Sequence, residues 1–338
     1  MDASVKKTSS LANFAVSRRK LLQVGAGLTA AGLIGLPSMA WAARLRLTVV
    51  TGSTGGVFYP YGGGLAKVLT EKGKDIQATA QVTGGSVDNI KLLGEEADIG
   101  FSTIDSAYDA TKGVGAYKDV GALDTKVLAV LYDSFMHVIV SASSGITSVA
   151  GLKGKRISVG SAGSSTEAIA DRVLAAAGLN PMKDVIRDNL SVAESVGALK
   201  DGKIAGMFWI GGIPTSAVKD LAASGQPPLT FIPTGKELAV MEKKWPGLYR
   251  PMTLPANVYE GQAKAVTGLG VSNVLVVSGE LADETVTRVL TTIFGNLVDV
   301  QKIHPEGRKL TLAGAAAKTA VQFHPAAEKF YRAKGAMK

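Results

Sequence analysis

The sequence contains no cysteine, so disulfide bonds and thiolate metal ligands are excluded. It has only three histidines, His137, His304 and His324, and they are too scattered to form an HExxH pair or a nucleophile–histidine arrangement. No serine lies in a GxSxG motif. We therefore expect no enzyme activity, no catalytic residue, no metal and no cofactor.

Runs of lysine and arginine interleaved with aromatic residues are also missing, which argues against nucleic-acid binding. The net charge is +9 over 338 residues, and it falls to about +5 without the five basic residues and one acidic residue of positions 1–42. A composition of 46% hydrophobic and 19% charged residues is typical of a soluble α/β protein. The remaining positive charge is compatible with attraction of an anionic solute.

Residues 1–42 have the features of a targeting segment and not of a membrane anchor. Arg18 and Arg19 precede an apolar stretch, residues 21–36, which is diluted by glycines and is shorter than the ~20 residues that a membrane span needs. Small residues at Ala40 and Ala42 suit cleavage near Ala42. This pattern predicts a cleavable twin-arginine-type signal and a periplasmic mature protein.

The sequence TGSTGGVFYPYGGGLA, residues 51–66, predicts a strand, a tight glycine turn and a helix. We expect Gly52, Gly55 and Gly56 to adopt positive φ and to allow another molecule to approach the backbone closely. The helix start after the turn offers unpaired N–H groups to an anion. The alternative is a tight connection that binds no ligand. The candidate ligand contacts here are Ser53, Thr54, Gly55, Gly56, Val57 and Tyr59.

The same pattern occurs twice more, after the expected strands 76–82 and 157–159. Each strand runs into glycines and hydroxyl residues and then into a helical spacing of apolar residues. Three such helix starts, each with hydroxyls at or near the N-cap, favour a binding site over three unrelated turns. The candidate contacts from these two turns are Gly85, Ser86, Ser161, Gly163, Ser164, Ser165 and Thr166.

Further candidates follow other expected strands. Ser102, Thr103 and Asp105 come after strand 97–101, and we expect Asp105 to be the N-cap of the next helix, a role that can coincide with ligand contact. Trp209 and Gly211 lie at another strand-to-helix turn, where Trp209 is either a wall of the cleft or a core aromatic. Arg172 lies inside a predicted helix, and we expect a surface role for it in preference to a ligand salt bridge.

The predicted elements favour two α/β lobes connected by two crossings. We assign residues 43–141 and 267–338 to lobe 1 and residues 142–266 to lobe 2, with crossings near residues 140 and 270 that would act as a hinge. Residues 127–132 and 137–141 are predicted as two separate strands and 271–277 as another. Residues 245–255 are predicted as a surface loop, and residues 281–300 as one long helix.

Several stretches resemble the TAXI group of solute receptors, which serve tripartite ATP-independent periplasmic (TRAP) transporters. They are TGSTGGVFYPYGGGLA, VTGGSVDNIKLLGEEADIGFSTIDSAY, LKGKRISVGSAGSSTE, Phe208 to Pro214 and FHPAAEKFYRAKG. The similarity stays in register after about residue 44, although family members usually carry glutamine and serine where this chain has Thr103 and Ile104. The resemblance implies a type II periplasmic-binding-protein fold, in which a small organic anion lies between two lobes. It also implies a monomer that delivers its solute to a TRAP-type membrane permease.

Two solute classes stay open at this point, a glutamate-like amino acid and a dicarboxylate or keto acid. An amino acid needs an acceptor for its ammonium group, and Asp105 is the candidate that the sequence offers. Other functional classes are a ligand-sensing module of a signalling kinase and a periplasmic hydrolase.

Overall fold

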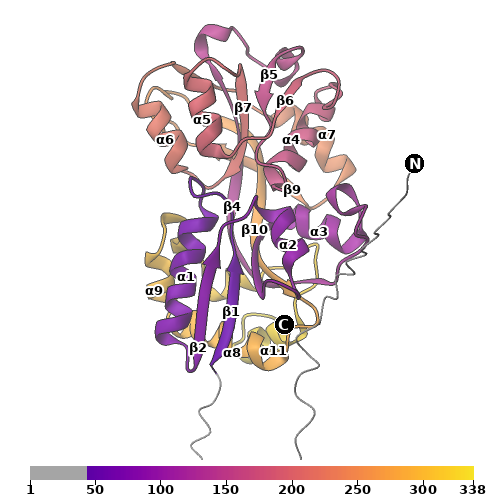
Figure 1. Cartoon of the computed structure of the whole chain (residues 1–338), viewed down its shortest axis with the longest axis vertical. Coiled ribbons are helices and arrows are strands. Elements are labelled where there is room, and N and C mark those ends of the chain that lie inside the picture. The colour runs from indigo at the N-terminus through magenta and orange to yellow at the C-terminus, as the bar shows by residue number, and fades with distance from the viewer. Residues whose placement is uncertain (1–43) are drawn as a thin grey trace, which may run out of the picture. The chain divides into compact units, whose positions relative to one another are not determined.

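The computed structural model describes residues 44–338, so the targeting segment predicted for residues 1–42 lies outside the described residues. Ten strands of the described part form one mixed sheet (Figure 1). They are β1 (Leu45–Val50), β2 (Ile76–Gln81), β3 (Ile99–Thr103), β4 (Thr125–Ser141), β5 (Arg156–Ser158), β6 (Ile186–Asp188), β7 (Gly206–Gly211), β8 (Leu229–Phe231), β9 (Tyr249–Leu254) and β10 (Val266–Ser278).

The sheet has the order β2-β1-β3-β10-β4-β7-β5-β6, with β9 added to β10 and β8 added to β4. Strands β1, β2 and β3 are parallel to one another, and so are β5, β6 and β7. Between these two parallel sets lie β10 and β4, which pair antiparallel to each other and to their outer neighbours. The long strands β4 and β10 therefore connect the two parallel sets.

Strand β4 is a single strand of 17 residues, so the prediction of two separate strands over residues 127–132 and 137–141 was wrong. Asp133 and Ser134 interrupt its apolar pattern, and this interruption suggested a break. Both residues have side-chain partners: Asp133 forms an ion pair with Arg250, and the hydroxyl of Ser134 accepts a hydrogen bond from Asn273. Because these partners satisfy the polar groups, the strand continues through them.

The helices cover both faces of the sheet. The α-helices are α1 (Phe58–Lys72), α2 (Ser86–Leu92), α3 (Ile104–Lys112), α4 (Ser165–Ala176), α5 (Val192–Lys200), α6 (Ser216–Ala223), α7 (Gly235–Lys244), α8 (Asp283–Gly295), α9 (Leu297–Lys302), α10 (Leu312–Ala315) and α11 (Pro325–Ala333), with 3₁₀ turns at Gly115–Tyr117, Ala142–Ser144, Val149–Leu152 and Pro305–Lys309. In Figure 1, helices α4 to α7 surround β5, β6 and β7 at one end, and α1, α8, α9 and α11 surround β1 and β2 at the other.

Two other predictions of local structure were wrong. The long helix expected over residues 281–300 is divided into α8 and α9 at Asn296, whose side-chain amide donates to the carbonyl oxygen of Thr292 at 2.9 Å. The proline-rich segment expected as a surface loop contains β9, which pairs with β10. Pro251 is compatible with β9 because this strand pairs with β10 alone, and proline is tolerated in edge strands.

The buried hydrophobic side chains form two clusters. The larger one runs along the whole sheet and includes Leu47 and Val274. The smaller one lies beneath α5 and α6 and includes Phe135 and Tyr259. Ala43–Lys338 groups as one unit by its contacts, and the division into two lobes stays a prediction. In the part of the chain that the structure describes, every helix is too short or too polar to cross a bilayer.

Candidate functional site

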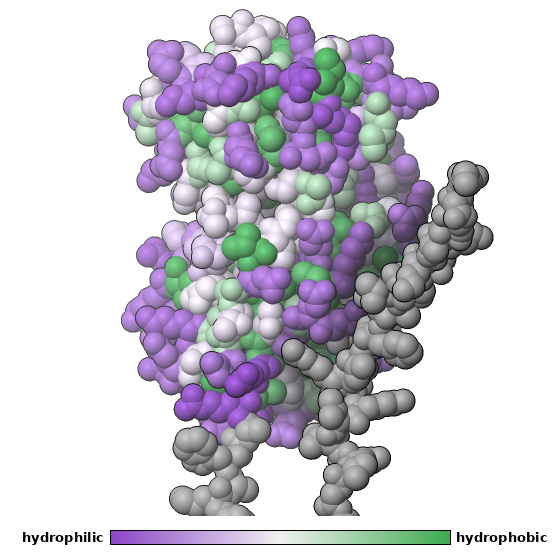
Figure 2. All heavy atoms as spheres, viewed as in Figure 1, coloured by the Kyte–Doolittle hydropathy of each residue, from purple (hydrophilic) through white to green (hydrophobic). Residues whose placement is uncertain are grey.

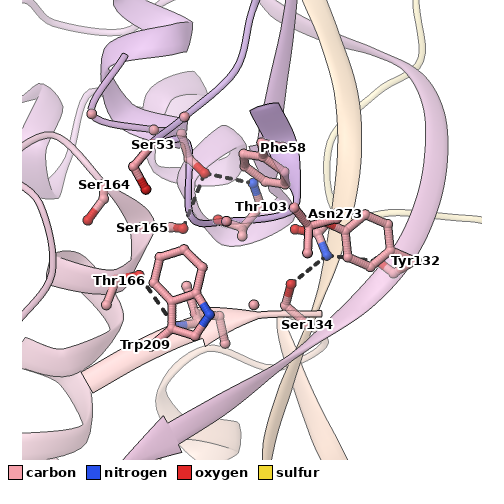
Figure 3. A pocket seen from close by; sticks show the side chains of 18 residues that line it. Ser53, Phe58, Thr103, Tyr132, Ser134, Ser164, Ser165, Thr166, Trp209 and Asn273 are labelled. Atoms are coloured by element: carbon pink, nitrogen blue, oxygen red, sulfur yellow. Dashed lines mark hydrogen bonds between the residues drawn. The ribbon is translucent and has the colours of Figure 1, made fainter. Parts of the chain in front are cut away.

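The candidate site is a pocket where the carboxyl ends of β1, β3 and β7 meet the starts of α1, α2 and α4 (Figure 3). It encloses about 430 Å³ of space not filled by atoms, including solvent at its mouth. Strands β4 and β10 contribute to its wall through Tyr132, Ser134 and Asn273. Both parallel sets of strands therefore direct their carboxyl ends to one pocket, as open α/β sheets do at their binding sites.

The turn between β1 and α1 needs glycine for close packing. The prediction of positive φ at Gly52, Gly55 and Gly56 was wrong, because the backbone has negative or extended φ at these positions. A Cβ atom on Gly56 would lie 2.9 Å from Cη2 of Trp209, and one on Gly55 would lie 3.1 Å from Val192. Helix α1 begins at Phe58, before the glycines at 62–64.

Helix α2 begins after Gly85, which has φ of 134° and therefore needs the freedom of glycine. The hydroxyl of Ser86 accepts the backbone N–H of Thr103 and donates to the hydroxyl of Ser165, each at 3.2 Å. The amides of Val87 and Asp88 both donate to the carbonyl oxygen of Gly163 at 3.1 Å. The first amides of α2 are thus occupied by the 160–164 turn, and only the Ser86 region faces the pocket.

Helix α4 has a complete N-cap and free donors beside it. The hydroxyl of Ser164 accepts the amide of Glu167 at 3.2 Å and donates to the carbonyl oxygen of Ser161 at 2.6 Å. The hydroxyl of Thr166 accepts the amide of Ile210 at 3.3 Å, so its own proton is available to the pocket. Among residues 44–338, the amides of Ser165 and Thr166 have no acceptor. These donors can bind an anion at the helix start.

Trp209 lines the pocket and is held from behind by a hydrogen-bonded network. Its indole N–H donates to the hydroxyl of Thr215 at 2.9 Å, and the amide of Thr215 donates to the hydroxyl of Tyr259 at 3.0 Å. That hydroxyl lies 3.0 Å from Nε2 of His137. Burial lowers the pKa of His137 to about 4, so the ring is neutral. Nδ1 lies 3.0 Å from the carbonyl oxygen of Phe135 and carries the proton.

Asp105 and Arg172 contact each other and are not among the residues that line the pocket. The predicted N-cap role of Asp105 and the predicted surface role of Arg172 were both wrong. The N-cap of α3 is Thr103, and Asp105 lies in the first helical turn. Arg172 is not a surface residue: its side chain is 12% exposed and pairs with Asp105 and Asp109. Tyr249 donates to Asp105 at 2.7 Å and accepts from Arg172 at 2.6 Å. Tyr249 and Arg172 thus occupy Oδ2 of Asp105, and Asp105 is not among the residues that line the pocket.

The charges of this cluster follow from its burial. Burial raises the pKa of Asp109 to about 6, against the lowering effect of Arg172 and with a smaller raising effect of Asp105. Burial alone would lower the pKa of Arg172, but Tyr249, Asp105 and Asp109 more than reverse this effect. The guanidinium group therefore stays charged and holds α4 against α3.

The described residues that line the pocket include no acidic, basic or histidine side chain. Figure 2 shows pale residues of near-neutral hydropathy gathered across the middle of the visible face, between more hydrophilic surfaces. An anion would therefore be bound by amides, hydroxyls and helix dipoles, without a counter-charge. Residues 44–338 also contain no group of three histidine or carboxylate side chains arranged to hold a metal ion.

The structure brings most of the predicted site residues together. Those that line the pocket are Ser53, Gly56, Val57, Gly85, Ser86, Thr103, Ser164, Ser165, Thr166, Trp209 and Gly211. Those that do not are Thr54, Gly55, Tyr59, Ser102, Asp105, Ser161 and Gly163. The hydroxyl of Ser102 donates instead to the carbonyl oxygen of Thr103, and Thr54 and Tyr59 are exposed.

The other lining residues were not among the candidate contacts from the sequence, and they are Gly52, Phe58, Gly84, Tyr132, Ser134, Ile210 and Asn273. Four of them are close neighbours of predicted residues. The other three, Tyr132, Ser134 and Asn273, come from the long strands β4 and β10. The sequence contained an indication for one of them, Asn273. Asn273 interrupts the apolar sequence VSNVLVV, and asparagine is depleted in strands, so a polar residue there has a specific use.

Two solved structures with TM-scores above 0.5 support the fold. A protein from Bordetella bronchiseptica RB50 is 17% identical, covers 88% of this chain and 90% of its own, and has a TM-score of 0.53. A structure described as a periplasmic transporter is 14% identical, covers 86% of this chain and 93% of its own, and has a TM-score of 0.52. The periplasmic aliphatic sulphonate binding protein SsuA from Escherichia coli is 15% identical, covers 77% of this chain and 78% of its own, and has a TM-score of 0.43.

The chain has the type II periplasmic-binding-protein fold, in agreement with its two parallel strand sets connected by β4 and β10. The family comparison covers nearly all of the described residues, because residues 49–335 match the NMT1-like family. This chain belongs to the NMT1-like family.

Proposed function

We propose that this protein is an extracytoplasmic solute receptor that captures a small organic anion in the pocket and delivers it to a TRAP-type membrane permease. The observation that carries this proposal is the pair of free amides at Ser165 and Thr166, next to unengaged hydroxyl protons in a pocket without charged side chains. Such a set of donors suits a carboxylate. The resemblance to TAXI receptors supports the transporter partner, and it also supports a receptor in preference to an enzyme.

Of the two solute classes that the sequence leaves open, the dicarboxylate or keto acid class fits the pocket better. A bound amino acid would bury its ammonium group, and a buried charge needs a partner. Asp105, the acceptor that the sequence suggested, is turned toward Arg172 and Tyr249. The described lining residues offer no other carboxylate.

We also propose that the solute is held by closure of two lobes, residues 43–141 with 267–338 and residues 142–266, about the strands β4 and β10. The contacts of Gly163 with α2 and of Arg172 with α3 join residues of the two proposed lobes. A ligand favours the closed form only if it binds that form more tightly. Small-angle scattering should therefore give a smaller radius of gyration at saturating ligand. An unchanged profile would argue for ordinary core strands.

The test of the receptor function is a thermal-shift screen of the purified protein against organic acids, followed by titration calorimetry. A ligand at ~100 times its Kd should stabilise the fold by about 2.7 kcal/mol. Absence of any shift over a broad panel of organic acids would contradict the proposal. Turnover of a bound acid would favour a hydrolase, and a histidine kinase gene beside this one, in place of a fused permease gene, would favour a sensor.

The proposed location is the periplasm, reached by a twin-arginine-type signal that is cleaved near Ala42. Changing Arg18 and Arg19 together to lysine should block export. Cell fractionation compares the variant with the parent. Normal periplasmic accumulation of the variant would point to a general secretory signal.

A further inference from the structure

We infer that Asn273 and Thr103 form a polar subsite for a neutral hydroxyl group of the ligand, so that the receptor selects hydroxy acids over the matching keto, amino and unsubstituted acids. This inference rests on the proposed function, which supplies the carboxylate at the start of α4. In Figure 3, Asn273 lies on the opposite side of the pocket from Ser165 at that helix start, and Thr103 lies between them.

The orientation of the Asn273 amide is fixed by its neighbours. Nδ2 donates to the carbonyl oxygen of Tyr132 at 3.0 Å and to the hydroxyl of Ser134 at 2.8 Å. A carbonyl oxygen only accepts, so a flipped amide would place two acceptors against each other. Oδ1 of Asn273 is therefore a hydrogen-bond acceptor of fixed direction.

A β-bulge produces this arrangement. Between Ser272 and Val274 the register of β10 against β4 shifts, so that two residues of β4 lie opposite Asn273. The bulge interrupts the ladder at Tyr132, and the side chain of Asn273 supplies a donor to the Tyr132 carbonyl oxygen. Bulges re-aim side chains next to binding sites. Here the extra residue lies in β4, opposite Asn273, and Asn273 is part of the pocket wall.

Two buried oxygens at this place have no partner among residues 44–338. They are Oδ1 of Asn273 and Oγ1 of Thr103, and the two residues are 0% and 1% exposed. Asn273 and Thr103 lie directly opposite each other in the β3–β10 ladder, and both line the pocket. Buried polar groups are normally hydrogen-bonded, so two adjacent exceptions in a pocket point to groups that a ligand satisfies.

The chemistry of the pair matches an alcohol. A ligand hydroxyl can donate to Oδ1 of Asn273 and accept the proton of Thr103 at the same time. A keto oxygen only accepts, so it would leave Asn273 without a partner, and a methylene group would leave both oxygens without one. An ammonium group could donate to both, but it would bring a charge into a pocket whose described lining residues carry no carboxylate.

The experiment is titration calorimetry on the purified protein with matched sets of acids. One set is malate, oxaloacetate, succinate and aspartate, and a second is 2-hydroxyglutarate, 2-oxoglutarate, glutarate and glutamate. We expect the hydroxy acid of the best-binding set to bind about 10- to 100-fold more tightly than its three analogues, because each analogue leaves a buried oxygen unpaired or adds a buried charge.

Two variants test the residues. In Thr103→Val and in Asn273→Leu the preference for the hydroxy acid over the unsubstituted acid should fall to less than about threefold, whereas Thr147→Val, at an exposed position, should keep it. Valine has nearly the same shape as threonine and lacks only the hydroxyl, so Thr103→Val remains informative if Asn273→Leu does not fold.

The results separate this inference from the proposed function. Equal or tighter binding of the keto, amino or unsubstituted member would overturn the inference and leave an organic-acid receptor. An unchanged preference in Thr103→Val would also overturn it. Failure of every acid to bind would contradict the proposed function itself, and the inference with it.

Discussion

The hydroxyl of Ser86 lies 3.2 Å from the hydroxyl of Ser165, although 79 residues separate them in the sequence. Ser86 also accepts the amide of Thr103, so its single proton is directed to Ser165. Ser165 consequently keeps its own proton for another acceptor, next to its unpaired amide. The contact between the starts of α2 and α4 thus leaves two donors of Ser165, its hydroxyl and its amide, free for a ligand in the pocket.

Ser165→Asp should weaken binding of the acid solute by at least about 100-fold, because it places a negative charge where we expect the ligand carboxylate. An aspartate in the first turn of a helix suits the helix dipole, so the fold should persist. Ser148→Asp, at the exposed N-cap of a 3₁₀ turn, is the matched control. Near-parental affinity of Ser165→Asp in titration calorimetry would show that the anion is not held at the start of α4.

Thr166→Val should weaken binding by roughly 10- to 150-fold, because a hydrogen bond to a charged group is worth ~1.5–3 kcal/mol. It should also lower the free energy of unfolding by ~1–3 kcal/mol, since the amide of Ile210 loses its acceptor. Calorimetry and urea unfolding separate the two effects. A loss of stability without a loss of affinity would mean that Thr166 only supports β7.

Gly56→Ala should weaken binding, because the added Cβ atom would lie 2.9 Å from the Trp209 ring and push this wall of the pocket out of place. Gly63→Ala is the control in the same segment. Its Cβ would meet no atom within 4 Å inside α1, so it should raise the free energy of unfolding by ~0.5–1 kcal/mol and leave affinity unchanged. Equal affinities of the two variants would argue against a role of Trp209 in binding.

Arg172→Met should lower the free energy of unfolding by ~3–5 kcal/mol at neutral pH, because it leaves the buried carboxylates of Asp105 and Asp109 without their cation. Arg156→Met removes an ion pair with Asp188 whose arginine side chain is 52% exposed, and it should cost less than about 1 kcal/mol. Urea unfolding measures both. Similar small losses would indicate that the Arg172 cluster contributes little to the fold.

His137 should make the protein sensitive to acid. The pKa of His137 is about 4 in the folded protein, whereas the ordinary value of 6.5 applies to the unfolded chain. The unfolded chain therefore binds the proton first as the pH falls. The stabilising contribution is complete above pH 6.5 and is lost between pH 6.5 and 4, up to about 3 kcal/mol. His137→Gln should lower this slope in urea unfolding measured from pH 7 to 4. Parallel curves for parent and variant would contradict the assignment.

The sequence was sufficient for those parts of the fold and site that depend on neighbouring residues. Alternating apolar residues followed by glycine, hydroxyl residues and a helical spacing predicted the turns that carry Ser86, Ser165 and Thr166, and these residues line the pocket. The pattern is local because a strand, its turn and the next helix start lie within about fifteen residues.

Tertiary structure decided what depends on pairing across the sheet. The polar residues of β4 looked like a break between strands, and Arg172 looked like a surface residue, because their partners Arg250, Asn273 and Asp109 are far away in the sequence. Asn273 lines the pocket opposite a bulge in the β4–β10 ladder, and the sequence does not show which residues of β4 it faces. Register between distant strands and the satisfaction of buried polar groups are properties of the packed chain, and no local pattern of residues determines them.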